Sequence, residues 1–347
     1  MSKIQHQNLL KFAKEVLQKA GLDEFSLNAV AESLCETSLR GIDSHGIRLL
    51  PHYVNSALKG RKNPKPNFKI ESKYPSMLFL DADDAFGHAA GMKAIELGME
   101  KADEYGIAAV GVGNSSHPGA MGSFALHAAR KGYIAFAFTH ADALLLSANG
   151  KRPFFGTNPI CVAAPRKGME PFCLDMATSK VSWNKVLSCR ANGTELGEGI
   201  AADGEGNTTP SADDAKCLLP TGEYKGYGLA SLVELLCGIF TGMLFGRDIP
   251  AMFTTPIDKP RKLGQFYMVL KADGCIAQNL FEERLLDMTE QISKEPTKGN
   301  DPVMLPGDRE IKVASQRGAE GIPLDPATLE GLQKLSADFQ IPLELLG

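Results

Sequence analysis

The residue whose type and position best suit catalysis is His117, in the middle of the stretch Asn114-Ser-Ser-His-Pro-Gly-Ala-Met-Gly122. An apolar run precedes this stretch and a helix-like run follows it, so it is predicted to be a polar loop between a strand and a helix. Enzymes of the α/β class commonly place reactive groups in such loops, and small neighbouring residues permit close approach of a ligand. An imidazole that titrates near neutrality suits proton transfer to an oxygen that becomes a hydroxyl group. On its position alone, His117 fits two interpretations equally well: a reactive group, or an ordinary loop histidine whose ring nitrogens form hydrogen bonds with the backbone.

A second polar stretch, residues 40–53, carries His45 and Arg48 three positions apart, which places them on one face of a helix. Arg48 has the planar fork of donors that can grip a carboxylate through two hydrogen bonds. An ordinary polar surface helix explains this spacing somewhat better when it is taken alone. Tyr53, at the end of the stretch, is predicted to pack in the interior rather than to contact a ligand.

Two stretches in the second half of the chain have features of a cofactor site. Asp175-Met-Ala-Thr-Ser179 follows a predicted strand and combines an acid with small residues, although a simple helix N-cap is the alternative for Asp175. Lys225 lies in a glycine-rich turn at the start of an apolar stretch, residues 225–245, which is predicted to be a buried helix. A helix N-terminus with a lysine can bind an anion, and a tight turn with a surface lysine is the alternative. Gly111-Val-Gly-Asn-Ser-Ser116 lacks the third glycine of a Rossmann fingerprint, so no Rossmann site is predicted.

Composition and missing motifs exclude several other classes of protein. The net charge of -4 gives no electrostatic case for nucleic-acid binding, and no apolar run reaches the roughly 20 residues of a membrane span. The N-terminus lacks the apolar core of a signal peptide, and the seven scattered cysteines indicate reduced thiols in a cytoplasmic protein. No metal site is predicted, because metal-binding motifs and cysteine clusters are missing, and a hydrolase would need a Gly-x-Ser-x-Gly motif.

The hydrophobic pattern predicts the elements that must position these residues. Helices are expected over residues 5–20 and from Ser26, as the N-cap, to about residue 40. The basic, proline-rich residues 59–67 are predicted to be a linker. Strands are expected at 68–72, 76–81, 107–112, 133–139, 160–164, 172–174 and 264–271, with helices over 89–105 and from residue 120. Residues 294–324 are predicted to be irregular, and Asp325-Pro326 opens a last helix.

Five motifs, in the same order along the chain, resemble those of one family, the malate/L-lactate/ureidoglycolate dehydrogenases. They are Gly41-Ile-Asp-Ser-His-Gly-Ile-Arg48, Asn114-Ser-Ser-His-Pro-Gly-Ala120, Gly156-Thr-Asn-Pro159, Asp175-Met-Ala-Thr-Ser179 and Lys225-Gly-Tyr-Gly-Leu229. The resemblance implies an α/β (α+β) fold in which a non-Rossmann mixed sheet with flanking helices binds the cofactor. It also implies a small helical N-terminal domain joined by the C-terminal helix. We therefore expect a helical substrate-side domain (1–66), a nicotinamide-binding α/β domain (67–290) and a C-terminal segment with a helix (291–347).

The resemblance implies a role for each matching residue. His117 would transfer the proton, His45 and Arg48 would face the carbonyl and carboxylate of the substrate, and Asp142 would lie near the nicotinamide and complete the catalytic set. Cofactor contacts are implied for the residues Asp175, Met176, Ala177, Lys225, Asn158, Gly307, Asp308 and Arg309. The cofactor would be NAD or NADP, and the protein would be a homodimer with its site between the subunits.

The resemblance implies an NAD(P)-dependent oxidoreductase that acts on a CH–OH group and interconverts a small 2-hydroxy acid with its 2-oxo acid. A reductase of cyclic imino acids, such as piperideine-2-carboxylate, is the alternative within the family. The chain departs from the family pattern at Pro118, Ser147-Ala-Asn-Gly150, Asn184 and Glu223. Several of these positions lie where the cofactor should sit, so the choice between NAD and NADP stays open. A catalytically weakened binding protein of the same fold is the alternative of another class.

Overall fold

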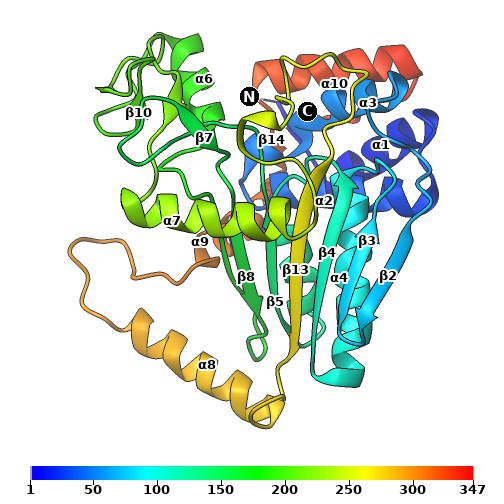
Figure 1. Cartoon of the computed structure of the whole chain (residues 1–347), viewed down its shortest axis with the longest axis vertical. Coiled ribbons are helices and arrows are strands. Elements are labelled where there is room, and N and C mark those ends of the chain that lie inside the picture. The colour runs from blue at the N-terminus through cyan, green and yellow to red at the C-terminus, as the bar shows by residue number, and fades with distance from the viewer. Residues whose placement is uncertain (1, 347) are drawn as a thin grey trace.

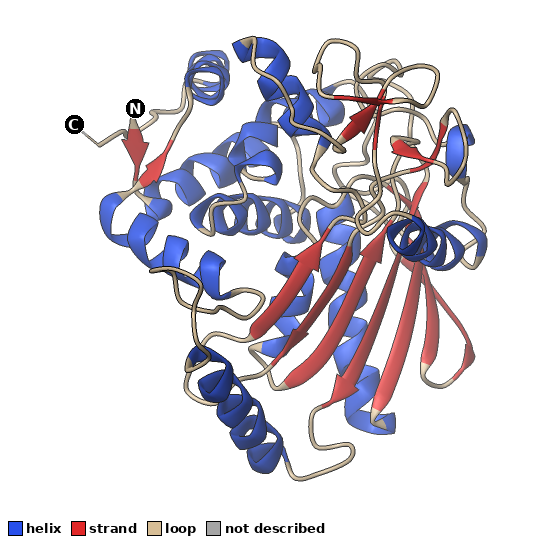
Figure 2. Cartoon of the chain, turned by 90° about the vertical axis from the view of Figure 1, so that its left-hand side faces the viewer, coloured by secondary structure: helices blue, strands red, loops and turns tan. Residues whose placement is uncertain are grey.

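A seven-stranded mixed sheet forms the centre of the computed structural model, which describes residues 2–346 (Figures 1 and 2). The strand order is β2-β3-β4-β13-β5-β8-β9. The pair β3–β4 is parallel, whereas the other five neighbouring pairs are antiparallel. Sheets of the Rossmann type are mostly parallel, so the prediction of a non-Rossmann mixed sheet is confirmed. The strands are Lys69–Tyr74 (β2), Met77–Asp81 (β3), Ile107–Ser115 (β4), Tyr133–Thr139 (β5), Ile160–Ala164 (β8), Phe172–Met176 (β9) and Leu263–Lys271 (β13).

Side-chain alternation along β5 gives the two faces of the sheet different helices. Ala135 and Ala137 belong to the core beneath α4 (Gly87–Tyr105) and α5 (Gly122–Ala129), where small side chains let helices pack closely. Phe136 and Phe138 belong to the core beneath α7 (Tyr224–Glu234) and the π-helical turn η3 (Leu235–Ile239). Figure 1 shows α7 crossing in front of the strands and α4 behind them.

A smaller sheet forms a lobe beside the main one, with strand order β11-β10-β12-β6-β7. Its strands are Leu145–Leu146 (β6), Pro153–Phe155 (β7), Ala201–Ala202 (β10), Thr208–Thr209 (β11) and Cys217–Leu218 (β12), and the helix α6 (Trp183–Asn192) covers it. Leu145, Val186 and Leu218 share a core with Ala230 of α7. The helix α7 therefore joins the lobe to the main sheet.

The N-terminal helices and the last helix share one hydrophobic core, as predicted. Phe12 and Leu34 are fully or almost fully buried together with Leu332 and Leu335. This layer consists of α1 (His6–Lys19), α2 (Glu24–Leu39), the 3₁₀ turns η1 (Asp43–His45) and η2 (Ile47–Leu49), α3 (Leu50–Leu58) and α10 (Pro326–Phe339). The short strands β1 (Lys3–Ile4) and β14 (Ile322–Pro323) pair and close it.

Capping residues explain where two of these helices begin. The Asp23 carboxylate accepts a hydrogen bond from the backbone N–H of Ser26 at 2.7 Å, so Asp23 is the N-cap of α2, and the prediction of Ser26 was wrong by one turn. Asp325 caps α10 as predicted, because its side chain accepts from the N–H of Thr328 at 2.9 Å.

The structure corrects two further predictions. Residues 294–324 were expected to be irregular, but they contain α9 (Asp308–Glu320), whose few apolar residues gave a weak helical pattern. Helix α8 (Gln278–Ser293) precedes it and lies at the edge of the molecule in Figure 1. Residues 225–245 were expected to form one buried helix. The α-helix ends at Glu234, and Leu235 and Phe240 are 53% and 56% exposed, because only one face of this segment meets the sheet. The 3₁₀ turn η4 (Gly246–Asp248) follows.

Candidate active site

The loop that carries His117 is held against the start of α4. The Ser116 hydroxyl accepts a hydrogen bond from Gly87 N at 2.9 Å and donates one to Ala85 O at 2.9 Å. Gly87 leaves no room for a side chain, because a Cβ there would lie 2.1 Å from Ser116 O. The residues beside His117 are buried, whereas His117 itself is half-buried.

Three ring side chains meet at this loop. The Nδ1 atom of His117 lies 2.8 Å from the Tyr53 hydroxyl, and His45 stacks on His117 with ring centroids 5.6 Å apart. The His45 Nδ1 atom in turn lies 2.8 Å from the Ser44 hydroxyl. The structure thus brings together the predicted residues His117 and His45. With Nδ1 engaged, Nε2 of His117 is the nitrogen that can exchange a proton with a ligand.

Tyr53 contacts His117 although the sequence predicted only packing for it. It is fully buried, as expected of a packing residue, but its hydroxyl contacts His117 from a position 64 residues away in the chain. Burial raises the pKa of the Tyr53 phenol, so the hydroxyl keeps its proton and can orient the imidazole. No local spacing links these two residues, so only the fold could reveal the pair.

The surroundings of both histidines disfavour the charged imidazole. Burial is the largest cause that lowers the pKa of His117 well below its usual value, followed by repulsion between a protonated His117 and its basic neighbours His45, Arg261 and Lys62. Burial, and then Arg48, lowers the pKa of His45 to about 4. The near-neutral pKa expected for His117 is therefore not found, because burial and the basic neighbours disfavour its charged form. A negative charge bound nearby would raise the pKa again.

Residues 59–67, which were predicted to be a basic linker, instead place two basic side chains inside the protein. Arg61 and Lys62 are each only 2% exposed. The Arg61 guanidinium donates hydrogen bonds to Met252 O at 2.7 Å and to Thr255 O at 2.6 Å. The composition of the segment suggested solvent exposure, but these carbonyl acceptors come from a loop about 190 residues later in the chain.

Asp142 is the counter-ion of a buried arginine. Its carboxylate pairs with the guanidinium of Arg261, a side chain only 2% exposed, which also donates from Nε to Pro250 O at 2.7 Å. Asp142 itself remains 19% exposed. Arg261 was not predicted as a site residue, since a single arginine before a strand carries no recognisable signal.

Arg48 lines a hollow whose lining does not include His117. Its side chain is exposed and lines this hollow of about 290 Å³ together with Arg317 and Asp325. It is nevertheless close enough to His45 to lower the pKa of that imidazole. The contact of Arg48 with a substrate carboxylate stays a prediction.

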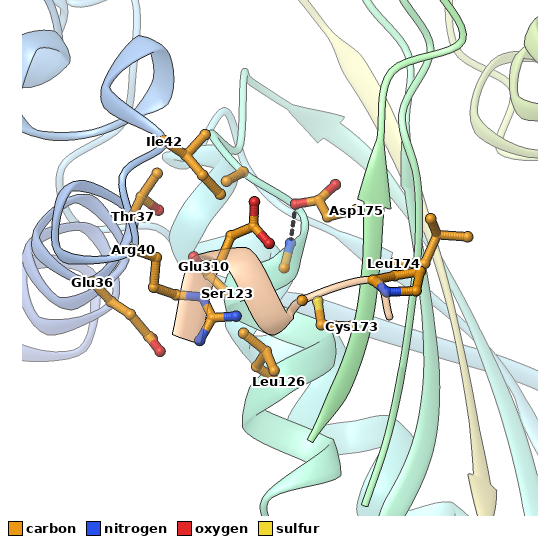
Figure 3. A pocket seen from close by; sticks show the side chains of 14 residues that line it. Glu36, Thr37, Arg40, Ile42, Ser123, Leu126, Cys173, Leu174, Asp175 and Glu310 are labelled. Carbon is orange, nitrogen blue, oxygen red and sulfur yellow. Dashed lines mark hydrogen bonds between the residues drawn. The ribbon is translucent and has the colours of Figure 1, made fainter. Parts of the chain in front are cut away.

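A cavity of about 240 Å³ brings together two of the predicted cofactor segments (Figure 3). Asp175, at the end of β9, and Gly307, before α9, both line it. The Asp175 carboxylate accepts a hydrogen bond from Gly122 N at 2.7 Å, and Figure 3 shows Glu310 facing the same space. Burial raises the pKa of Asp175 to about 6; the Gly122 hydrogen bond opposes this rise and the Glu310 charge adds to it.

The other predicted cofactor residues differ in what their side chains contact. The Asn158 amide donates to Glu234 at 2.6 Å, and the Asp308 carboxylate accepts from Arg166 at 2.9 Å, so both side chains are engaged within the protein. Lys225 and Arg309 are exposed, whereas Met176 and Ala177 are partly buried at the end of β9. Their contacts with a cofactor stay predictions.

The described part of the chain shows three further features. Between residues 2 and 346, no group of three or more His, Cys, Asp or Glu side chains could hold a metal ion. No helix in that range is long and apolar enough to cross a membrane. The cysteines are free thiols, six of them buried and Cys275 exposed.

Comparison with known proteins identifies the family. The family model described as malate/L-lactate dehydrogenase matches residues 4–333. A malate dehydrogenase from Pyrococcus abyssi is 34% identical over 96% of this chain and 94% of its own length. A ureidoglycolate dehydrogenase (NAD(+)) from Escherichia coli O157:H7 is 32% identical over 93% of this chain and 92% of its own.

Solved structures agree with these relatives. The crystal structure of malate dehydrogenase from Entamoeba histolytica superposes with a TM-score of 0.93 at 25% identity and covers 99% of both chains. A delta1-piperideine-2-carboxylate reductase from Pseudomonas syringae superposes with a TM-score of 0.85 at 27% identity, over 96% of this chain and 100% of that one. The chain belongs to the malate/L-lactate dehydrogenase family. The family predicted from the five motifs is confirmed, and with it the reaction class, nicotinamide-dependent oxidation of a CH–OH group.

Proposed function

We propose that this protein interconverts a small 2-hydroxy acid and its 2-oxo acid with a nicotinamide cofactor, and that His117 transfers the proton. The observation that carries the proposal is the contact between Tyr53 and His117 in a loop that also borders the Asp175 cavity. Ala120 and Gly122, from the same loop, line that cavity. One loop therefore places a proton-transfer group beside the space predicted to hold part of the cofactor.

The cavity fits a fragment of a dinucleotide rather than the whole molecule, because sites for complete drug-sized ligands usually measure about 300–1,000 Å³. Its carboxylates suit the hydroxyl groups of a ribose, which donate hydrogen bonds to them. When bound, the nicotinamide supplies or accepts the hydride. His117 would give a proton to the developing alkoxide in the reduction and take it back in the oxidation. Arg48 would hold the carboxylate.

Oxidation of NADH and NADPH by a panel of 2-oxo acids and cyclic imines, followed by nicotinamide absorbance, tests the proposal. We expect turnover with at least one 2-oxo acid. The runner-up function is reduction of a cyclic imino acid, and the structural likeness to the Pseudomonas syringae reductase supports it. Faster turnover of delta1-piperideine-2-carboxylate than of every 2-oxo acid would favour the runner-up. No turnover and no nicotinamide binding would favour a non-catalytic protein of this fold.

We further propose that the cofactor is NAD rather than NADP. The cavity is lined by the acids Glu36, Asp175 and Glu310 and by one base, Arg40. Arg40 already lies 3.6 Å from the carboxylate of Glu170. Excess negative charge attracts the 2′-hydroxyl of NAD as a donor and repels the 2′-phosphate of NADP. NADH should accordingly bind more tightly than NADPH.

Binding of NADH should depend on the ionisation of Asp175. The pKa of this carboxyl is raised to about 6, so its charge is present above pH 6 and is lost as the pH falls below it. We expect the NADH dissociation constant, measured by nicotinamide fluorescence, to fall roughly tenfold from pH 5 to pH 7. This is the usual contribution of one hydrogen bond to a charged group. The variant Asp175→Asn should lose this dependence, whereas Asp273→Asn on an exposed turn should keep it. NADH binding that is constant over this range in the wild type would contradict the assignment.

We also propose that the protein is a homodimer whose interface includes α7 and η3. Four large apolar side chains of α7, η3 and the residue that follows η3 are between 45% and 56% exposed: Leu232, Leu235, Ile239 and Phe240. Exposed large apolar side chains gathered in one segment are typical of a protein interface. The free, mostly buried thiols favour a reducing, cytoplasmic location.

The variant Leu235→Asp should weaken the dimer at least tenfold, because it would bury a carboxylate in an apolar interface. Light scattering after size-exclusion chromatography would give the mass of each species. Leu280→Asp is the matched control, since Leu280 is 44% exposed on α8 and lies outside the proposed interface. A monomeric wild type, or an unchanged dimer in Leu235→Asp, would remove this surface from the interface.

A further inference from the structure

The apolar segment 225–245 carries one acidic residue, Glu234, and its carboxylate is buried. Glu234 is the last residue of α7 and is only 3% exposed. Burying a carboxylate costs free energy unless hydrogen bonds replace its water. The Glu234 oxygens accept from the amide of Asn158 at 2.6 Å and from Gly246 N at 2.6 Å. These two bonds connect the end of α7 to two segments that are remote from it in the chain or follow a turn.

Asn158 is fully buried, and every polar atom of its amide is engaged within the protein. Its Nδ2 atom donates to Glu234 and to Ala230 O at 3.1 Å, which uses both N–H groups. Its Oδ1 atom accepts from Ala141 N at 3.2 Å. The amide therefore has no free N–H group for the cofactor contact that the resemblance implied.

The Glu234 carboxylate decides which way the Asn158 amide points. An amide can turn by 180°, which exchanges the places of its oxygen and nitrogen atoms. A carboxylate only accepts hydrogen bonds, so Glu234 must face the nitrogen of the amide. The oxygen is thereby directed to the N–H group of Ala141. A side chain that could also donate would allow both orientations, and Ala141 would lose its fixed acceptor.

His140 belongs to the same group of buried side chains and is the first residue after β5. Its Nε2 atom accepts from Gly264 N of β13 at 2.8 Å, so the proton of the neutral ring is on Nδ1. The Nδ1 atom lies 3.6 Å from Oε1 of Glu234, which is an electrostatic contact too long for a hydrogen bond. The end of β5 is therefore held from two sides, by β13 and by Glu234 with Asn158.

The segment held in this way leads directly to Asp142, which follows Ala141. The Asp142 carboxylate pairs with Arg261, and Arg261 is near enough to His117 to contribute to the low pKa of that imidazole. Gly156 restricts the segment further, because a Cβ atom there would lie 2.5 Å from Ala141 O. The hydrogen bonds thus run from α7 to the residue that the resemblance places near the nicotinamide.

We propose that Glu234 is a positioning residue of the active site, which acts through Asn158 to fix Ala141 and thereby the place of Asp142. Asn158 then serves this segment rather than the cofactor. The proposal rests on the proposed function, because it takes Asp142 to lie beside the bound nicotinamide. Neither Glu234 nor Asn158 transfers a proton or a hydride. They set the geometry in which the transfers occur, and a displacement of about 1 Å can lower such a rate about 100-fold.

The variant Glu234→Gln keeps the shape of the side chain but adds a donor. We expect kcat to fall about 10- to 100-fold, because the Asn158 amide is no longer oriented and Asp142 shifts. The affinity for NADH should stay close to that of the wild type, since Glu234 does not line the Asp175 cavity. Asp23→Ala is the matched control, because it removes another carboxylate that accepts from a backbone N–H, that of Ser26 at 2.7 Å. It should lower the denaturation midpoint but leave kcat unchanged.

A double-mutant cycle shows whether Glu234 acts through Asp142. Asp142→Asn should itself lower kcat. Adding Glu234→Gln to it should lower kcat further by less than about twofold, because residues of one hydrogen-bond network do not have additive effects. Two losses that multiply would overturn the proposal, and so would a wild-type kcat in Glu234→Gln.

Exchanging the two polar groups gives a second test, which serves if Glu234→Gln does not fold. Asn158→Asp alone places two carboxylates side by side and should lower kcat strongly. In Asn158→Asp/Glu234→Gln the new glutamine can donate to the new aspartate, whose second oxygen can accept from Ala141 N. We expect kcat of the double variant to be about tenfold above that of Asn158→Asp, the contribution of one charge-assisted hydrogen bond. If the amide of Asn158 bound the cofactor instead, the double variant would stay as inactive as Asn158→Asp.

Hydrogen–deuterium exchange, measured by mass spectrometry, tests the contact without turnover and so separates this proposal from the proposed function. The peptide that contains Ala141 should exchange about tenfold faster in Glu234→Gln than in the wild type, and the peptide that contains Ser26 should not change. Faster exchange at Ala141 in a protein that turns over no substrate would support the role of Glu234 and refute the oxidoreductase. Turnover by the wild type, with unchanged exchange at Ala141 in the variant, would support the oxidoreductase and overturn the role of Glu234.

Discussion

Replacing His117 by alanine should lower the turnover number by about 100-fold or more, the usual contribution of a positioned acid or base. The imidazole contacts Tyr53 and stacks on His45, and it is partly exposed, so its removal takes away the proton-transfer group without opening the core. It does not line the Asp175 cavity, and the affinity for NADH should therefore stay close to that of the wild type.

The turnover number at saturating substrate and the fluorescence of bound NADH measure the two effects separately. His127→Ala is the matched control, because His127 lies on α5, contacts Lys131 at 3.0 Å and does not contact His117. Full turnover in His117→Ala would remove this residue from proton transfer. A loss of NADH binding as large as the loss of turnover would instead make His117 a cofactor contact.

The main sheet was predictable because its strands are local patterns. Strand β5 occupies residues 133–139 and β8 residues 160–164, as the sequence indicated. In β5, alanines on one face alternate with phenylalanines on the other, and each face meets its own core. An alternation of this kind can be recognised in the local sequence without knowledge of the rest of the chain.

The residues around His117 were only partly predictable. The family motifs led to His117 and His45, which the fold places in contact. Tyr53 and Lys62 gave no such signal, since an aromatic residue on a helix normally means packing and a lysine in a basic, proline-rich run normally means solvent. Tyr53 is buried as predicted, but the contact of its hydroxyl with His117 depends on the fold. The expectation of solvent exposure was wrong for Lys62, because the rings of Tyr53 and Phe86 cover its ammonium group.

The apolar segment 225–245 shows that composition predicts that a surface is buried, but not whether the same chain or a second one covers it. Its residues meet the sheet on one face, and the other face is exposed in the single chain. The prediction of a buried helix took both faces to be covered by this chain. In the proposed homodimer a second copy would cover the exposed face. The prediction of a buried segment would then hold for the dimer but not for the single chain.

Gly264→Ala should lower the free energy of unfolding by about 3 kcal/mol or more, a value at the upper end for overpacking. Gly264 lies in an irregular stretch of β13 where η3 crosses the strand. A Cβ atom there would lie 1.7 Å from Cys237 O and 2.7 Å from the Thr241 hydroxyl. Because the nearer atom belongs to the backbone, no rotamer change can relieve the overlap, and η3 would have to move off the sheet.

Chemical denaturation gives the free energy of unfolding of this variant and of its control. Gly318→Ala is the control, because Gly318 lies in α9 and a Cβ atom there would meet no neighbouring atom within 4 Å, so alanine should stabilise the helix by about 0.5–1 kcal/mol. The same displacement of η3 should disturb the surface proposed for the dimer, so Gly264→Ala should lower the fraction of dimer as well as the stability. Wild-type stability in Gly264→Ala would show that η3 is not packed closely on β13. If the variant is less stable but still fully dimeric, η3 does not contribute to the dimer interface, and the second copy must bind another surface of the chain.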